Sequence, residues 1–223
     1  MERQIQTTSD GSTTIHIKDW NESYHSRHGA IQEALHVFIG NGLNLFDGKV
    51  AIMEIGFGTG LNAFVTFLSA LDRNLVVDYT GIEAFPISED EANAMNFVDQ
   101  LQANQHRHVF EKMHGAPWGE LISIDPKFNF TKRRQFFQEI TDSDKYDLIF
   151  FDAFGFDVQP ELWSADIFRR MFNALKPGGM LVTYAARGIV KRNMMDAGFT
   201  VAKLAGPPGK REMFRAQKSI MPI

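Results

Sequence analysis

Apolar residues follow two alternating patterns from residue 50 onward. Short continuous apolar runs are typical of strands buried on both faces, whereas apolar residues that recur every three or four positions mark one face of a helix. The alternation predicts an α/β fold: a doubly wound, mostly parallel sheet with helices on both faces. The strand-like runs are 50–55, 76–83, 146–151, 180–185 and 199–204, and the helical segments are 61–71, 163–175 and 189–197. A last run at 212–217 follows a short turn without a helix, so we expect it to close the sheet antiparallel.

The N-terminal residues have a different pattern. Residues 3–18 hold two runs of alternating polar and apolar residues around Asp10-Gly11, which predicts a β-hairpin. Apolar positions in 29–38 have helical spacing and predict a short helix over one end of the fold. We therefore expect a hairpin and helical cover at 1–48 and an α/β domain at 49–223.

The middle of the chain is less regular. Ser88 and Glu91 have the spacing of a capping box, which predicts a helix running to about residue 101. Residues 128–136 predict a strand in spite of four polar residues within it, and 105–124 show no clear pattern.

Three closely spaced glycines, Gly56, Gly58 and Gly60, stand between the strand at 50–55 and the helix at 61–71. Glycine lets backbone N–H groups approach a ligand, and the start of a helix attracts negative charge, so we expect a nucleotide-like ligand here. The dinucleotide fingerprint requires Gly or Ala where this chain has Leu61, which argues against NAD and FAD. A tight β-to-α turn without a ligand is the alternative.

Two acidic residues end predicted strands at the same edge of the sheet, where open α/β sheets bind ligands. Glu83 is placed to accept hydrogen bonds from ribose hydroxyls, or else to cap the next helix. Asp152 ends a strongly apolar strand, and the following loop contains Phe154 and Trp163, which suit a flat base carrying an amine. Alternatively, these rings pack in the core and Asp152 satisfies a turn.

Composition limits the kinds of function. The 223 residues carry a formal charge of −4 and contain no cysteine, which excludes disulfides and thiolate metal sites. We find no leader and no apolar stretch of membrane-spanning length, so we expect a cytoplasmic protein without membrane or metal partners. Residues 187–218 hold eight basic and two acidic residues, which indicates either a polyanion-binding surface or a solvated basic face.

The glycine segment, with Glu54 before it, resembles the first motif of class I S-adenosylmethionine-dependent methyltransferases. Segments 21–26, 150–154, 159–163 and 206–216 resemble the methyltransferase of the MnmC group, most specifically in the run Gly-Pro-Pro-Gly-Lys-Arg-Glu-Met. The resemblance implies a Rossmann-like methyltransferase domain at 49–223. It also implies N-methylation of the 5-aminomethyl group of the wobble uridine in the tRNA anticodon region, giving 5-methylaminomethyl(-2-thio)uridine. Bifunctional members add an FAD-dependent oxidase; with no room for it here, we expect a stand-alone methyltransferase.

The resemblance also implies roles for individual residues. Asp152 is the expected catalytic residue, which orients the amine and accepts its proton. The expected substrate contacts are Phe154 and Trp163 for the base, and four basic residues for tRNA phosphates: Lys191, Arg192, Lys210 and Arg211. The expected S-adenosylmethionine contacts are Tyr24, Glu54, Gly56, Phe57, Gly58, Thr59, Gly60, Asn62, Glu83 and Asp152.

Two questions stay open at this stage. The resemblance implies an acidic or polar residue near the end of the third strand that holds the adenine; residues 131–135 read Thr-Lys-Arg-Arg-Gln, so this contact is not assigned. The alternatives for function are a catalytically silent Rossmann-like module that binds RNA or protein, and an N-methyltransferase of small amines or proteins.

Overall fold

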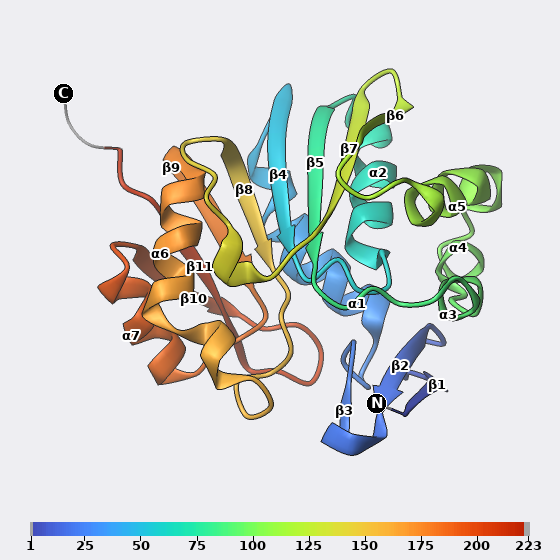
Figure 1. The fold of residues 1–223 in the computed structure, drawn as a ribbon, viewed down its shortest axis with the longest axis horizontal. Helices are drawn as coiled ribbons and strands as arrows, with labels where there is room; N and C mark the ends of the chain where they lie inside the picture. Colours follow the sequence, from blue (N-terminus) through green and yellow to red (C-terminus); the bar gives the residue numbers. More distant parts are fainter. Residues whose placement is uncertain (1, 221–223) are drawn as a thin grey trace.

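The computed structural model describes residues 2–220 and has one central sheet of eight strands (Figure 1). The strand order is β10-β11-β9-β8-β4-β5-β7-β6. Neighbours from β9 to β7 pair parallel, whereas β11 is antiparallel to both of its neighbours and β6 is antiparallel to β7. The strands are β4 (Lys49–Ile55), β5 (Val76–Glu83), β6 (Leu121–Asp125), β7 (Phe128–Arg134), β8 (Tyr146–Phe151), β9 (Leu175–Thr183), β10 (Thr200–Ala205) and β11 (Glu212–Gln217).

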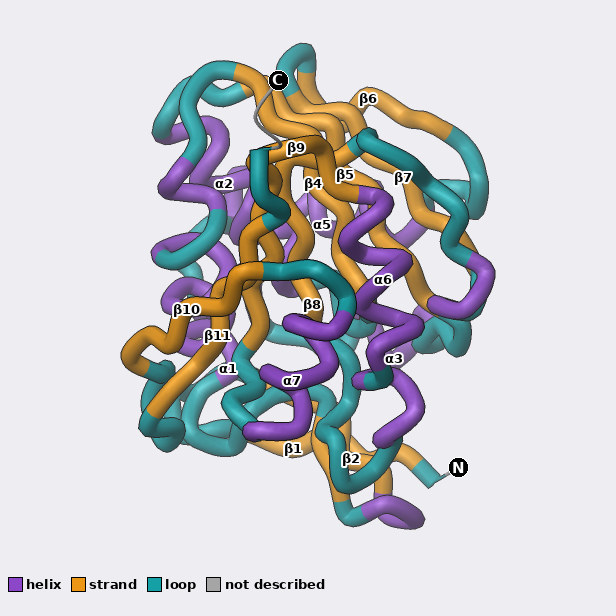
Figure 2. The backbone as a smooth tube through the Cα atoms, turned by 90° about the vertical axis from the view of Figure 1, so that its left-hand side faces the viewer, coloured by secondary structure: helices purple, strands orange, loops and turns teal. Residues whose placement is uncertain are grey.

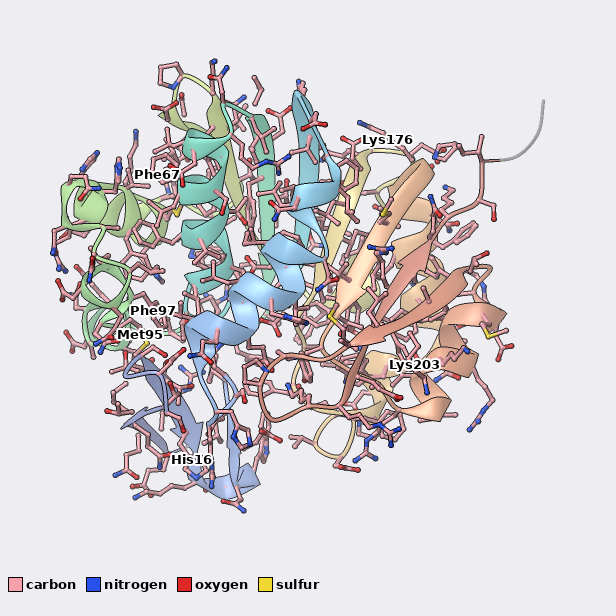
Figure 3. All side chains as sticks on the ribbon, turned by 180° about the vertical axis from the view of Figure 1, so that it is seen from behind. His16, Phe67, Met95, Phe97, Lys176 and Lys203 are labelled. Carbon is pink, nitrogen blue, oxygen red and sulfur yellow. The ribbon has the colours of Figure 1, made fainter. Side chains whose placement is uncertain are left out.

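Helices cover both faces of the sheet, and the alternation of side chains along each strand gives two hydrophobic clusters. Ile52 of β4 belongs to the cluster under α1 and α2, and the next residue, Met53, belongs to the cluster under α6 and α7. Figure 3 shows the first of these faces, with Phe67 of α2 labelled, and Figure 2 shows α6 and α7 on the other. The helices are α1 (Ala30–Ala34, continued by a π-helical turn at Leu35–Gly40), α2 (Leu61–Asp72), α3 (Glu89–Asn93), α4 (Phe97–Gln100), α5 (Arg107–Gly115), α6 (Ala165–Ala174) and α7 (Gly188–Asp196).

The predicted α/β fold with an antiparallel closing strand is therefore confirmed. The structure adds two elements, helix α5 and strand β6, in the region 105–124 where the sequence showed no pattern, and β6 is a second antiparallel strand at the edge of the sheet. The single helix predicted for 88–101 is wrong, because the structure has α3 and α4 separated at Asn96. There the side chain of Asn96 accepts a hydrogen bond from Thr13 N at 2.8 Å and donates to Gly11 O at 2.9 Å. These tertiary contacts compete with a continuous helix.

A small antiparallel sheet lies at the carboxyl ends of the central parallel strands (Figures 1 and 2). It consists of β1 (Arg3–Thr7), β2 (Thr13–Ile17) and β3 (Glu22–Ser23). The first two strands confirm the predicted hairpin, and β3 extends it. The division into parts at 1–48 and 49–223 stays a prediction.

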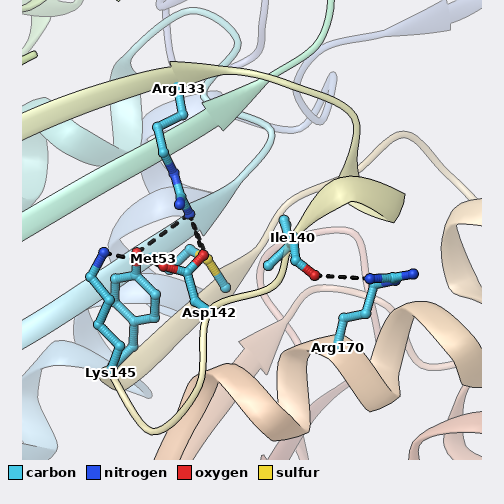
Figure 4. Close-up of polar contacts among 7 residues, drawn as sticks. Met53, Arg133, Ile140, Asp142, Lys145 and Arg170 are labelled. Carbon is cyan, nitrogen blue, oxygen red and sulfur yellow. Dashed lines mark hydrogen bonds and ion pairs between the residues drawn. The ribbon is translucent and has the colours of Figure 1, made fainter. Parts of the chain in front are cut away.

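The loop from β7 to β8 is fixed against the domain by polar contacts (Figure 4). Arg133 at the end of β7 donates to Asp142 at 2.7 Å, and Lys145 pairs with the other oxygen of Asp142 at 3.1 Å. Arg170 of α6 donates to Ile140 O at 2.9 Å. These contacts direct Arg133 into the loop and fix the segment that begins with Phe136.

The helices found between residues 2 and 220 include none with the combined length and hydrophobicity needed to cross a membrane.

Candidate active site

A cavity of about 550 Å³ lies between the carboxyl ends of β4, β5 and β8 and the small N-terminal sheet. This volume is typical of a site for a small molecule or cofactor. Its walls come from the turn between β4 and α2, the ends of β5 and β8, the N-terminal segment, and the loop between β10 and β11.

The glycine turn packs directly against the end of β8. Gly56 has a φ of +86°, and a Cβ on it would lie 2.4 Å from the carbonyl oxygen of Asp152. Only glycine permits both this conformation and this approach. The turn therefore brings its backbone next to the carboxylate predicted to be catalytic.

Asp152 is half-buried in the cavity wall and accepts a hydrogen bond of 2.8 Å from Asn62 Nδ2. The pKa of Asp152 is raised to about 7, chiefly by burial and also by the negative charge of Glu33, while the hydrogen bond from Asn62 and the charge of Lys210 act in the opposite direction. A carboxyl group that titrates near neutral pH is suited to accept a proton and release it again.

Glu83 stands beside the glycine turn at the end of β5. One oxygen accepts from Gly58 N at 3.0 Å and the other from Phe85 N at 2.9 Å. Each oxygen keeps a lone pair, so Glu83 can hold the turn and still accept bonds from hydroxyl groups of a ligand.

Aromatic rings form one wall of the cavity. Phe154 meets Tyr24 edge-on with ring centroids 4.9 Å apart, and it meets Trp20 in the same way at 5.5 Å. Phe85 and Phe136, which also line the cavity, pair edge-to-face at 5.7 Å and are 54% and 50% exposed. This second pair is not among the residues predicted from the sequence, although Phe85 lies two residues after Glu83, at the strand end where a ligand is expected.

Thr59 is held from two sides. Its hydroxyl lies 2.6 Å from His25 Nε2, and its carbonyl oxygen lies 3.0 Å from His114 Nε2. Burial lowers the pKa of both histidines to about 4, so both are neutral at neutral pH. Gly60 packs against His114 and does not line the cavity, so its predicted role as a cofactor contact becomes one of shaping the turn.

Two predicted contact residues have no accessible surface. Glu54 is 0% exposed and accepts a bond of 2.8 Å from Tyr79 Oη; burial raises its pKa well above the usual value. Trp163 is also 0% exposed, packs on Phe151 at 5.0 Å, and donates from Nε1 to Phe154 O at 2.8 Å. The direct contacts predicted for them are wrong, because neither side chain reaches the cavity. Both support residues that do.

Lys210 faces inward, and its predicted contact with a tRNA phosphate stays a prediction. It lines the cavity, pairs with Glu33 at 2.5 Å, and its Nζ lies 3.7 Å from the ring centroid of Tyr184. A lysine held in this way is not presented to a phosphate at the surface. Glu33 and Tyr184 were missed, although Tyr184 directly follows β9 as Asp152 follows β8.

The other predicted residues divide by position. Those that line the cavity are Tyr24, Gly56, Phe57, Gly58, Thr59, Asn62, Glu83, Asp152 and Phe154. The basic residues Lys191, Arg192 and Arg211 are outside the set that lines it; Arg192 and Arg211 are exposed, and Lys191 is half-buried. Across residues 2–220 no three His, Asp or Glu side chains are grouped closely enough to hold a metal ion.

Comparisons with known proteins agree with this arrangement. A family model described as S-adenosyl-L-methionine-dependent methyltransferase matches residues 120–219. Among solved structures, MNMC2 from Aquifex aeolicus superimposes with a TM-score of 0.78 and 24% identity, over 100% of this chain and 71% of that one. This likeness confirms the class I methyltransferase fold.

Among curated proteins, the chain is similar to the tRNA 5-methylaminomethyl-2-thiouridine biosynthesis bifunctional protein MnmC of two bacteria. The protein from Leptospira borgpetersenii serovar Hardjo-bovis is 29% identical over 91% of this chain and 33% of its own length. The protein from Nitrosospira multiformis is 27% identical over 88% of this chain and 34% of its own length. The chain spans about a third of the length of these relatives. The comparisons confirm the predicted resemblance and the predicted methyl donor: the chain is similar to a family of S-adenosyl-L-methionine-dependent methyltransferases over residues 120–219 and to about a third of the MnmC proteins.

Proposed function

We propose that the chain N-methylates the 5-aminomethyl group of a wobble uridine in tRNA, giving 5-methylaminomethyl(-2-thio)uridine. The observation that carries this proposal is the carboxylate of Asp152 in a cavity that also contains the glycine turn and an aromatic wall. The names of the MnmC relatives support the same substrate.

The cavity has the groups that S-adenosylmethionine requires. Backbone close to the ligand is supplied by the turn at Gly56 and Gly58, and Glu83 can accept bonds from ribose hydroxyls. The exposed rings of Phe85 and Phe136 are suited to an adenine face. When bound, the cofactor supplies a methyl group on a positively charged sulfur.

Asp152 is the proposed general base. An amine attacks only when it is neutral, but a primary amine is mostly protonated at neutral pH. Asp152 accepts that proton, and the bond from Asn62 at 2.8 Å fixes the direction of its carboxylate. Phe154 lies beside this group on the aromatic wall, where a pyrimidine ring can stack.

Binding of the tRNA itself is assigned to Lys191, Arg192 and Arg211, outside the cavity. Their charges are suited to phosphates, and the wobble base would leave the anticodon stack to enter the cavity.

The test is methyl transfer to a defined RNA. The purified chain is incubated with labelled S-adenosylmethionine and an anticodon stem-loop that carries 5-aminomethyluridine at the wobble position, and nucleosides are identified by mass spectrometry. The expected product is the 5-methylaminomethyl nucleoside. Transfer only to a small amine or a protein, or binding of the cofactor without any transfer, would contradict the proposal and favour one of the alternatives.

A further inference from the structure

The segment Gly206–Arg211 contributes to the cavity through Lys210, although its basic residues first suggested a surface role. Gly209 has a φ of +81°, and a Cβ on it would lie 2.1 Å from Cδ2 of His28. Glycine therefore permits the loop between β10 and β11 to press against the N-terminal segment. This close approach directs Lys210 inward to the acid at residue 33.

Lys210 is bound on two sides within the cavity. Its Nζ pairs with Glu33 Oε2 at 2.5 Å and lies 3.7 Å from the ring centroid of Tyr184. Glu33 is only 7% exposed and belongs to α1, yet it lines the same cavity as Asp152. Its charge acts on Asp152 strongly enough to raise the pKa of that group.

The charges in this part of the cavity do not balance. Asp152 and Glu33 are two carboxylates, and Lys210 is a single cation beside them. The lining as a whole also has an excess of acidic residues: Glu22, Glu33, Glu83, Asp152 and Glu161 outnumber the basic residues Arg3 and Lys210. A substrate group with one positive charge would compensate this excess, whereas a neutral or anionic group would not.

We propose that Glu33 is the second carboxylate of an ammonium subsite, where it binds the amine of the substrate together with Asp152. Lys210 is the resident cation that compensates the charge of Glu33 before the substrate enters. The inference rests on the proposed function only for the identity of the amine as a 5-aminomethyl group.

The alternative is that Glu33 and Lys210 merely tie the N-terminal helix to the C-terminal hairpin. The two roles predict different effects of substitution. A purely structural ion pair is lost equally when Glu33 or Lys210 is changed, whereas an ammonium subsite loses its ligand only when Glu33 is changed. Lys210→Met removes a competing cation and leaves the carboxylate in the cavity.

The experiment measures binding of two nucleosides that differ in the charge of one group, 5-aminomethyluridine and 5-hydroxymethyluridine, to the S-adenosylhomocysteine complex. Wild type should prefer the amine by about tenfold or more, the effect of one charge-assisted hydrogen bond. Glu33→Gln should lose most of this preference, and Lys210→Met should keep it. Glu212→Gln is the matched control, because Glu212 pairs with Lys203 at 3.0 Å away from the cavity.

Two results would overturn the inference: a preference unchanged in Glu33→Gln, or equal losses in Glu33→Gln and Lys210→Met. Affinity for S-adenosylhomocysteine is measured on every variant to verify that the cavity is intact. If Glu33→Gln does not fold, the Lys210→Met variant decides: loss of the preference for the amine in that variant would contradict the subsite. The assay involves no methyl transfer, so a failure to methylate wobble uridine would refute the proposed function and leave this result standing.

Discussion

The pKa of Asp152 is set by neighbouring residues that act in opposite directions. Burial and Glu33 raise its pKa, and Asn62 and Lys210 lower it. The neighbours come from α1, α2 and the β10–β11 loop, so parts of the chain far apart in sequence set the proton affinity of one carboxyl group. This dependence makes its role testable by single substitutions.

Replacing Asp152 with asparagine should lower kcat by about 10²- to 10⁴-fold, the usual contribution of a general base. The amide keeps the shape of the side chain but cannot accept the proton. Affinity for S-adenosylmethionine, measured by calorimetry, should stay close to that of wild type. Equal losses in kcat and in cofactor affinity would make Asp152 a structural residue.

The pH dependence of kcat should report the same group. Asp152 must be ionised to act, so activity should rise with pH through about 7. Glu33→Gln removes a negative charge and should move this rise to lower pH, and Lys210→Met removes a positive charge and should move it to higher pH. Rate profiles between pH 5 and 9 give the midpoints. Shifts in the same direction, or none, would exclude Asp152 as the titrating base.

The glycine turn between β4 and α2 has a local conformation that brings it into contact with the candidate site. Its glycines could be recognised from spacing alone, since a strand, three glycines and a helix follow one another directly. The contact between Gly56 and the end of β8 could not be recognised from the sequence, because the two are almost 100 residues apart along the chain. The turn therefore offers a test that separates local strain from tertiary contact.

Gly56→Ala should destabilise the fold more than Gly48→Ala. Both glycines have positive φ, +86° and +73°, but a Cβ at Gly48 meets nothing within 4 Å, whereas one at Gly56 meets Asp152 O at 2.4 Å. We expect a loss of about 1–2 kcal/mol in the free energy of unfolding for Gly48→Ala, and about 3 kcal/mol or more for Gly56→Ala. Urea unfolding of both variants gives the values. Equal losses would show that the contact with Asp152 is unimportant for stability.

Elements with strong periodicity could be predicted closely. The strand expected at 76–83 and the helix expected at 61–71 match β5 and α2 within one residue. Errors occur where distant contacts decide the outcome, as at Asn96 between α3 and α4. The inward direction of Lys210 and the burial of Trp163 have the same origin, because composition shows that a residue is basic or aromatic but not which side it faces.

Buried carboxyl groups link the stability of the whole molecule to pH. Glu54 is fully buried, and its pKa is raised well above 4.5, so the folded chain keeps a proton that the unfolded chain releases. Stability contributed in this way is complete below 4.5 and is lost as pH rises through the folded pKa.

Glu54→Gln should therefore make stability less dependent on pH. Glutamine is neutral at every pH and can still accept the bond from Tyr79 Oη. Chemical unfolding at intervals from pH 5 to 9 should show a shallower decline than in wild type, with the difference between the two curves growing with pH. Parallel curves would mean that Glu54 does not hold a proton in the folded state.

Residues 187–218 have fewer unpaired positive charges in the structure than their sequence suggests. Arg187, Lys203 and Lys218 pair with Asp157, Glu212 and Asp144, and Lys210 faces the cavity; Figure 3 shows Lys203 on β10. Within residues 2–220, no acid forms an ion pair with Lys191, Arg192 or Arg211. Arg215 of β11 likewise forms no ion pair with a described residue. These four side chains have charge free for a phosphate, and Lys191, Arg192 and Arg211 are the three assigned to the tRNA.

The salt dependence of tRNA binding should distinguish the two groups of basic residues. Each phosphate contact lowers log affinity as log salt rises, so Lys191→Gln, Arg192→Gln and Arg211→Gln should each reduce the slope by about 1 and weaken binding at low salt. Lys203→Gln is the control, since its charge is already matched by Glu212 at 3.0 Å. Filter binding between about 50 and 200 mM salt gives the slopes. If Lys203→Gln changes the slope as much as the other substitutions, the phosphates contact the whole basic C-terminal part, and Lys191, Arg192 and Arg211 have no special role.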